Sequence, residues 1–222
     1  MDKANGANLA TERSATSVWQ NTGSGTLPRS KESVSLNLRT PTRVTDALVE
    51  FCASISETEE PGFVEVHPSI DSELNQCFVN AADVARRSGG SVQHGWMVHE
   101  WPDVLFEAQF HAVWRQPDGT LVDVSPNDER RIFFLPDQMR VYVGERTPSI
   151  QRARSNAAEV LRFIQSCQEL WRYEADRWME SEGDVVLDTP FEKVMHRHLQ
   201  AAKALSQFQL YDMLGISWRP RD

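Results

Sequence analysis

The sequence is poor in cysteine, in long apolar runs and in positive charge, and each shortage excludes a class of protein. Its three cysteines, Cys52, Cys77 and Cys167, have unrelated spacings, which argues against a disulfide framework or a zinc knuckle. No stretch reaches the roughly 18 apolar residues that a membrane-spanning helix needs, and the N-terminus lacks the apolar core of a signal peptide. We therefore expect a soluble, cytoplasmic protein whose thiols stay reduced.

The charge balance argues against two kinds of partner. The chain has 23 Lys and Arg against 32 Asp and Glu, which gives a formal net charge of −9, and no segment forms a basic stripe. A phosphate backbone or an anionic membrane would repel such a surface. Neither nucleic acid nor a membrane is therefore expected as a partner.

The 222 residues divide into three segments of different composition. Residues 1–40 are rich in Ser, Thr, Asn and Gly, with scattered apolar residues, which predicts a disordered leader. The export signal of a delivered effector can look similar, although an unstructured leader is the simpler interpretation. Residues 41–146 carry the patterns of a folded core, and residues 147–222 those of a C-terminal helical hairpin.

The core segment starts with helical patterns and ends with strand patterns. Apolar residues recur at three- and four-residue spacing over 41–55 and over 71–87, on either side of a short alternating strand at 63–67. Aromatic and β-branched residues then predict strands at 95–101, 104–115, 120–124, 132–135 and 138–143. This order predicts an α+β fold in which a helix packs on an antiparallel sheet.

Two helices are expected after the strands. The first has an apolar face from 157 to 178. The second starts at Thr189, which can cap it together with Glu192, while Pro190 occupies the first helical position. We expect these helices to form a hairpin that packs on the core, as a lid or as part of it, or that docks on a protein partner.

Three residues in the core have the types and the order of a thiol-based catalytic triad. Cys77 lies at the start of a predicted helix, His111 lies on a predicted strand, and Asp123 lies on the strand after it. A thiol nucleophile needs a general base and a carboxylate that orients the base. Cys77 could also be a buried core residue beside a structural histidine, but the ordered His and Asp favour the triad.

The loop between the two strands predicts that His111 and Asp123 meet. Gln116–Thr120 has Pro117 where a type I turn favours it and Gly119 in the left-handed position, as in a three-residue hairpin loop with a bulge. Gln116 then pairs with Thr120, and the two side chains become diagonal neighbours on one face. A two-residue loop would put them on opposite faces.

Other residues are candidates for the surroundings of the site. A helix that starts near Asn75 would place Cys77 in its first turn, where the helix dipole favours a thiolate, and Asn75 or Gln76 could donate to an oxyanion. Glu107 and Gln109 share the strand face of His111. Trp114 is one of several strand aromatics that could wall a substrate cleft.

Part of the core is similar to a known superfamily. The chain has His-Ala-Val-Trp at 111–114, Pro-Asp-Gly at 117–119 and Leu-Val-Asp-Val-Ser-Pro at 121–126. This pattern resembles the His-Ala-Trp, Gly and Asp-Pro-Thr run of transglutaminase-like proteins, which share a papain-like core with arylamine N-acetyltransferases. The resemblance covers residues 74–126, with Phe78 where the family often has Trp after its cysteine.

The resemblance implies a papain-like fold and a Cys77, His111 and Asp123 triad. The expected function is thiol-dependent acyl transfer on a peptide or a small amide or thioester, by hydrolysis (peptidase, amidase or deamidase) or by transfer to an amine. An arylamine N-acetyltransferase type of reaction is another interpretation. No cofactor or metal is expected, since His94 and His99 would face opposite sides of their strand. The alternative function is a non-catalytic module that binds a protein partner through its C-terminal hairpin.

Overall fold

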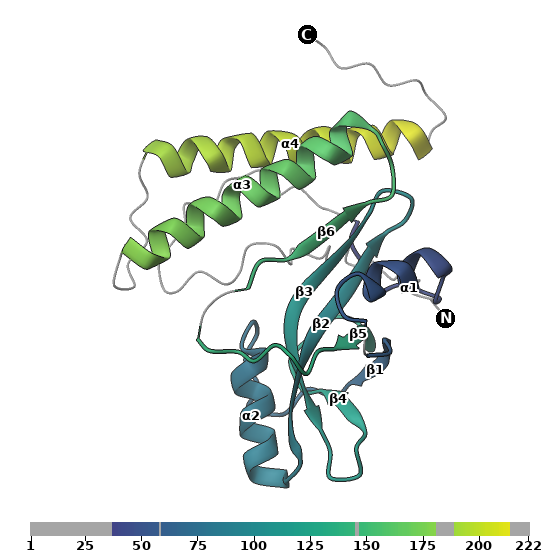
Figure 1. The fold of residues 1–222 in the computed structure, drawn as a ribbon, viewed down its shortest axis with the longest axis vertical. Coiled ribbons are helices and arrows are strands. Elements are labelled where there is room, and N and C mark those ends of the chain that lie inside the picture. The colour runs from purple at the N-terminus through teal and green to yellow at the C-terminus, as the bar shows by residue number, and fades with distance from the viewer. Residues whose placement is uncertain (1–36, 58, 145–146, 181–188, 214–222) are drawn as a thin grey trace, which may run out of the picture.

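The computed structural model describes residues 37–57, 59–144, 147–180 and 189–213, and these form an α+β fold (Figure 1). The described helices are α1 (Asp46–Ala53), α2 (Cys77–Ser88), α3 (Ala158–Glu180) and α4 (Thr189–Met213). The described strands are β1 (Gly62–Val66), β2 (Ser91–Trp101), β3 (Leu105–Arg115), β4 (Leu121–Asp123), β5 (Arg131–Pro136) and β6 (Ile150–Ala153). The α+β class predicted from the sequence is confirmed. Residues 1–36 of the predicted leader lie outside the described residues.

The sheet is mixed and closes on itself. Its strands follow the order β2-β5-β1-β4-β3-β6, and β2 also pairs with β3, so five strands form a closed barrel with β6 outside it. β1 runs parallel to β4, with Glu65 opposite Val122 and Val66 opposite Asp123. The prediction of a purely antiparallel sheet is therefore wrong, because β1 inserts between β4 and β5, which come far later in the chain.

The strand predicted at 138–143 does not form. Asp137, which follows β5, accepts hydrogen bonds through Oδ1 from the backbone N–H of Met139 at 2.9 Å and of Arg140 at 3.2 Å. These two hydrogen bonds form a local turn and occupy backbone N–H groups that a strand would use for pairing. The sixth strand forms instead at β6, where Ile150 pairs with Ala108 of β3.

Alternation along the strands separates an inner face from an outer face. Side chains from five strands meet on the inner face and form the barrel core: Val64, Val113, Ile132 and Phe134, with Val66, Met97 and Leu121 beside them. The outer face is covered by two helices. α1 packs on Trp96, Val98 and Phe106, whereas α2 packs on Ala112, Val122 and Val124. The two helices therefore cover different parts of the outer surface.

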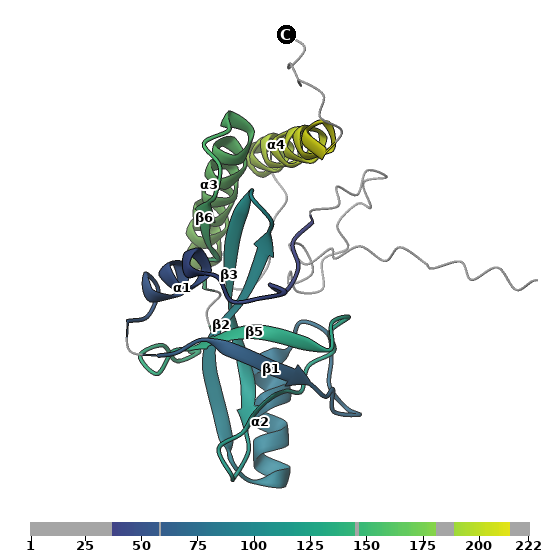
Figure 2. The same ribbon diagram turned by 90° about the vertical axis from the view of Figure 1, so that its right-hand side faces the viewer.

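The helices α3 and α4 lie side by side at the upper end of the β2–β3 hairpin, as both ribbon views show (Figures 1 and 2). Val160, Phe163, Cys167, Ala202 and Leu205 of these helices pack with Trp101, Val104 and Leu105 near the turn of that hairpin. Leu38 joins the same core, and Arg39 pairs with Glu100 of β2, so residues 37–40 pack on the sheet. Within the described residues, no helix is long and apolar enough to cross a membrane.

Candidate active site

Cys77 is the first residue of α2, so its place at the start of a helix is as predicted, whereas the helix predicted over 71–87 begins six residues later than expected. Asn75 adopts a left-handed φ of 64°, which a short polar side chain tolerates, and turns the chain into the helix. Gln76 is the N-cap residue and makes no side-chain capping hydrogen bond. No side chain of the cap therefore competes for the backbone N–H groups of the first turn, whose partial positive charge favours an anion at this position.

The turn between β3 and β4 has the geometry that the sequence predicts. The N–H of Gln116 donates to the carbonyl of Thr120 at 2.8 Å, and the N–H of Gly119 donates to the carbonyl of Gln116 at 2.9 Å. Gly119 has φ 90°, which favours glycine. Trp114 pairs with Val122 in the resulting register, so the three-residue loop is confirmed.

This register brings His111 and Asp123 together in the interior. His111 Nε2 lies 3.1 Å from Asp123 Oδ2. Both side chains are buried, with 7 % of His111 and 0 % of Asp123 exposed. The second carboxylate oxygen, Oδ1, accepts a hydrogen bond from the N–H of Ser125 at 2.9 Å. Both oxygens of Asp123 therefore have donors, and the imidazole has a fixed orientation.

Cys77 completes the arrangement, because the charge of His111 and a side-chain hydrogen bond with it act on the pKa of the thiol. Since Nε2 faces Asp123, Nδ1 is the ring nitrogen that remains for the thiol. The backbone N–H of Ala112 also donates to the Cys77 sulfur. The three residues that the sequence singled out thus lie together, with His111 bonded to Asp123 and acting on the thiol of Cys77.

Opposing effects act on the pKa values of Cys77 and His111. Burial raises the pKa of the Cys77 thiol, but the charge of His111 and the hydrogen bonds from His111 and Ala112 outweigh burial and hold that pKa below its ordinary value. Burial lowers the pKa of His111, but the charges of Cys77 and Asp123 and their hydrogen bonds raise it well above its ordinary value. Both shifts favour a thiolate beside an imidazolium.

Between β6 and β4, one edge of β3 has a gap with no pairing strand in the described part of the chain, and the Cys77 thiol reaches β3 there. β2 pairs with β3 from Leu105 to Arg115 on the other edge. On the gapped edge, β6 pairs with 105–108 and β4 with 114–115. No strand in the described part of the chain pairs with 109–113 on this edge. The start of α2 lies at this gap, which leaves the N–H of Ala112 available for the sulfur.

Gly95 allows an aromatic ring to support His111. The two residues lie directly opposite each other on β2 and β3. A Cβ on Gly95 would lie 2.3 Å from the carbonyl oxygen of Leu135 and 2.5 Å from Cζ of Phe134. The Phe134 ring packs edge-on against the imidazole with centroids 6.4 Å apart. The missing side chain thus makes room for the ring that packs on His111.

Two polar residues that the sequence analysis missed belong to the same network. Asn80 lies one turn after Cys77 and is buried, and its side chain hydrogen-bonds the backbone of Glu73 and the hydroxyl of Ser125. Ser125 in turn binds Asp123. The sequence feature that could have indicated Asn80 is an asparagine within an otherwise apolar helical stripe, three residues after the candidate nucleophile.

The other predicted site residues have different positions. Asn75 and Gln76 are exposed beside Cys77. Gln109 donates to Glu107 at 3.3 Å, and Glu107 is buried further along the strand, where burial raises its pKa. Trp114 lies on the opposite face of β3 and donates to the carbonyl of Gly89, just past the far end of α2. Trp114 therefore does not line the surroundings of the thiol.

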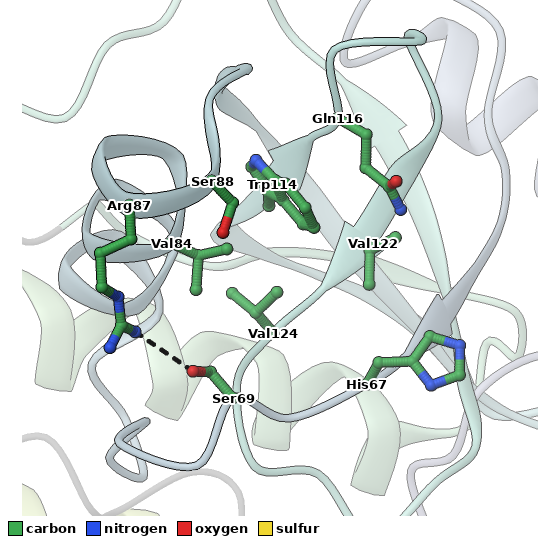
Figure 3. Close-up of a pocket in the computed structure, with 9 residues that line it drawn as sticks. All are labelled: His67, Ser69, Val84, Arg87, Ser88, Trp114, Gln116, Val122 and Val124. Atoms are coloured by element: carbon green, nitrogen blue, oxygen red, sulfur yellow. Dashed lines mark hydrogen bonds between the residues drawn. The ribbon is translucent and has the colours of Figure 1, made fainter.

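Trp114 instead lines a pocket of roughly 390 Å³ beside the C-terminal half of α2. Its lining includes Val84, Val122 and Val124, and Arg87 hydrogen-bonds Ser69 at its rim at 3.2 Å (Figure 3). A second pocket, of roughly 460 Å³, lies between the start of β2 and the residues after β5. Neither pocket is lined by Cys77 or His111.

The other two cysteines lack such surroundings. Burial raises the pKa of Cys52 to about 12, and burial also raises the pKa of Cys167. Cys167 lies 3.9 Å from His198 Nδ1, but burial lowers the pKa of that histidine to about 4, so it cannot hold a thiolate near neutral pH. Within the described residues, no group of three or more His, Cys, Asp or Glu side chains could hold a metal ion.

Comparison of the chain with protein-family models, with curated proteins and with solved structures finds no match.

Proposed function

We propose that the protein is a thiol-dependent acyl-transfer enzyme with Cys77 as nucleophile, His111 as general base and acid, and Asp123 as the residue that orients His111. The hydrogen-bonded chain from the thiol through the imidazole to a buried carboxylate carries the proposal. The fold that we propose is papain-like, of the transglutaminase-like type. The order of nucleophile helix, histidine strand and aspartate strand supports it.

The proposed first step forms a thioester. The Cys77 thiolate attacks the carbonyl carbon of an amide or thioester, and the electron pair of the carbonyl moves to its oxygen. First-turn N–H groups of α2 are the donors best placed for this oxyanion. When the tetrahedral intermediate collapses, the bond to the leaving group breaks. An amine leaving group takes its proton from His111 Nδ1.

The second step releases the acyl group. Neutral His111 removes a proton from water or from an acceptor amine, which attacks the thioester carbonyl. Collapse expels the Cys77 thiolate and leaves the imidazole protonated, which regenerates the starting pair. Hydrolysis of an amide is our first choice of reaction, and transfer to an amine is the second. This mechanism requires no cofactor.

Cysteine reactivity tests the proposal without a known substrate. Iodoacetamide alkylation of each cysteine, followed by peptide mass spectrometry between pH 5 and 9, should show Cys77 reacting far faster than Cys52 and Cys167 at pH 6. The His111→Ala variant should lose this advantage. Equal, slow reaction of all three cysteines in the parent protein would contradict the proposed enzymatic function and favour a non-catalytic binding module.

A substrate screen can then separate hydrolysis from transfer. The protein is incubated with a complex peptide mixture in heavy-oxygen water that contains a primary amine. Hydrolysis adds heavy oxygen to the new carboxyl group, whereas transfer adds the amine. The Cys77→Ala variant should give neither product.

A further inference from the structure

The side chain of Asn80 joins the two segments that carry Cys77 and Asp123. Only 5 % of Asn80 is exposed. Its Oδ1 accepts the N–H of Glu73 at 3.0 Å, and its Nδ2 donates to the carbonyl of Glu73 at 2.7 Å and to Ser125 Oγ at 3.2 Å. One amide group thus binds the turn before α2 and the residue after Val124.

Each of these partners is also hydrogen-bonded to a residue of the triad or to its neighbour in the chain. The carbonyl of Glu73 also accepts the N–H of Gln76 at 3.4 Å, which closes the turn that delivers Cys77. Ser125 donates its own N–H to Asp123 Oδ1 at 2.9 Å. The other oxygen of Asp123 faces His111, so a continuous path of hydrogen bonds connects the helix start with the imidazole.

Stability alone gives little reason for an amide at this position. The neighbouring buried residues of α2 are Ala81 and Val84, and an apolar residue would continue their stripe. A buried amide is destabilising when a partner is missing, and each hydrogen bond of a satisfied one contributes only a modest net free energy. What Asn80 adds is directional contact with two segments, which fixes how far apart they lie.

We propose that Asn80 is a positioning residue that holds the start of α2 against the segment Asp123–Ser125, at the spacing that the hydrogen bond between Cys77 and His111 needs. The inference rests on the proposed function. Without the amide, the Glu73 turn and the Ser125 backbone can move apart, and the sulfur then moves relative to an imidazole held by Asp123. Small displacements weaken such a hydrogen bond steeply.

The test compares pH profiles of Cys77 alkylation by iodoacetamide in four proteins. Asn80→Ala removes all three side-chain hydrogen bonds, and Ser125→Ala removes one while keeping the N–H that binds Asp123. Leu48→Ala is the control, because it opens a cavity beneath α1, away from α2, and lowers the free energy of unfolding. The free energy of unfolding is measured for each protein alongside.

The inference predicts a graded effect that does not follow stability. At pH 6, alkylation of Cys77 should slow at least roughly tenfold in Asn80→Ala and less in Ser125→Ala, and both profiles should move to higher pH. Leu48→Ala should keep the parent profile despite its lower stability. If Asn80→Ala does not fold, a parental profile in Ser125→Ala overturns the inference.

The outcomes also separate this inference from the proposed function. A parent protein without a reactive Cys77 at pH 6 contradicts the proposed function itself. A reactive parent together with a folded Asn80→Ala variant of unchanged profile contradicts only the role of Asn80. A shift of equal size in Leu48→Ala would contradict it as well, because the effect would then follow stability.

Discussion

Replacing Asp123 by asparagine should remove most of the reactivity of Cys77 while leaving the shape of the site unchanged. The N–H of Ser125 donates to Oδ1 at 2.9 Å, so the amide oxygen of the new side chain must stay at that position. The amide NH₂ then faces His111 Nε2, where Oδ2 lies at 3.1 Å in the parent. An NH₂ group can only donate, so Nε2 must become an acceptor.

This change favours the tautomer of the neutral imidazole that carries its proton on Nδ1. With Nε2 accepting, the ring proton sits on Nδ1, which faces Cys77, and His111 can no longer take the proton of the thiol. A hydrogen bond to a charged group is worth about 1.5–3 kcal/mol, which corresponds to roughly a 10- to 150-fold change in the thiolate–imidazolium population. We expect Cys77 alkylation at pH 6 to slow by this factor.

The assay combines reactivity with a direct view of the ring. Iodoacetamide rates are measured at pH 6 for Asp123→Asn and for Asp118→Asn, a matched change of an exposed carboxylate in the β3–β4 loop. Nuclear magnetic resonance of the His111 ring nitrogens reports the tautomer. Parental alkylation of Cys77 in Asp123→Asn would refute the reasoning, and so would equal slowing in Asp118→Asn.

Three further predictions follow from the turn, from the packing and from the paired charges. Deleting Gly119 shortens the loop to two residues and flips the strand after it, so Cys77 alkylation at pH 6 should fall to the rate of His111→Ala. In Gly95→Ala, the new Cβ would lie 2.5 Å from the ring that packs on His111, whereas Gly62 has nothing within 4 Å of a new Cβ. Chemical denaturation should show a loss of about 1–3 kcal/mol for Gly95→Ala and almost none for Gly62→Ala. The raised pKa of His111 contributes stability that is complete below 6.5 and is lost as the pH rises, while the lowered pKa of Cys77 contributes stability that is complete above 9.0 and is lost as the pH falls. These two slopes have opposite signs, so the free-energy difference between the parent and Cys77→Ala/His111→Ala should change little with pH where the folded pair is charged and the unfolded pair is neutral. It should fall above and below that range, by up to about 1.4 kcal/mol per pH unit.

Local patterns in the sequence were sufficient for the nucleophile helix and for the His111–Asp123 pair. Helical periodicity indicates α2 but starts it at residue 71, six residues before its observed start at Cys77. The diagonal placement of His111 and Asp123 follows from the loop Gln116–Thr120. Both depend on residues close together in the chain. Turn chemistry and strand alternation therefore determine them without knowledge of the whole fold.

Contacts between distant segments could not be predicted in this way. The parallel pairing of β1 with β4 joins residues more than fifty positions apart, and neither strand signals its neighbour. The pairing of β6 with β3 was missed because the pattern favoured a strand at 138–143, where hydrogen bonds to Asp137 form a turn instead. The gap at 109–113, which exposes the N–H of Ala112 to Cys77, results from both pairings and has no local signature.

The ultraviolet absorbance of the thiolate tests the paired charges most directly. The difference in absorbance between the parent and Cys77→Ser, followed from pH 4 to 10, isolates the titration of this one sulfur. Our account predicts that the thiolate signal is already present at pH 6 and that it falls only in more acidic solution, because His111 stabilises the anion. A signal that appears only near pH 9, as for an ordinary thiol, would contradict the account.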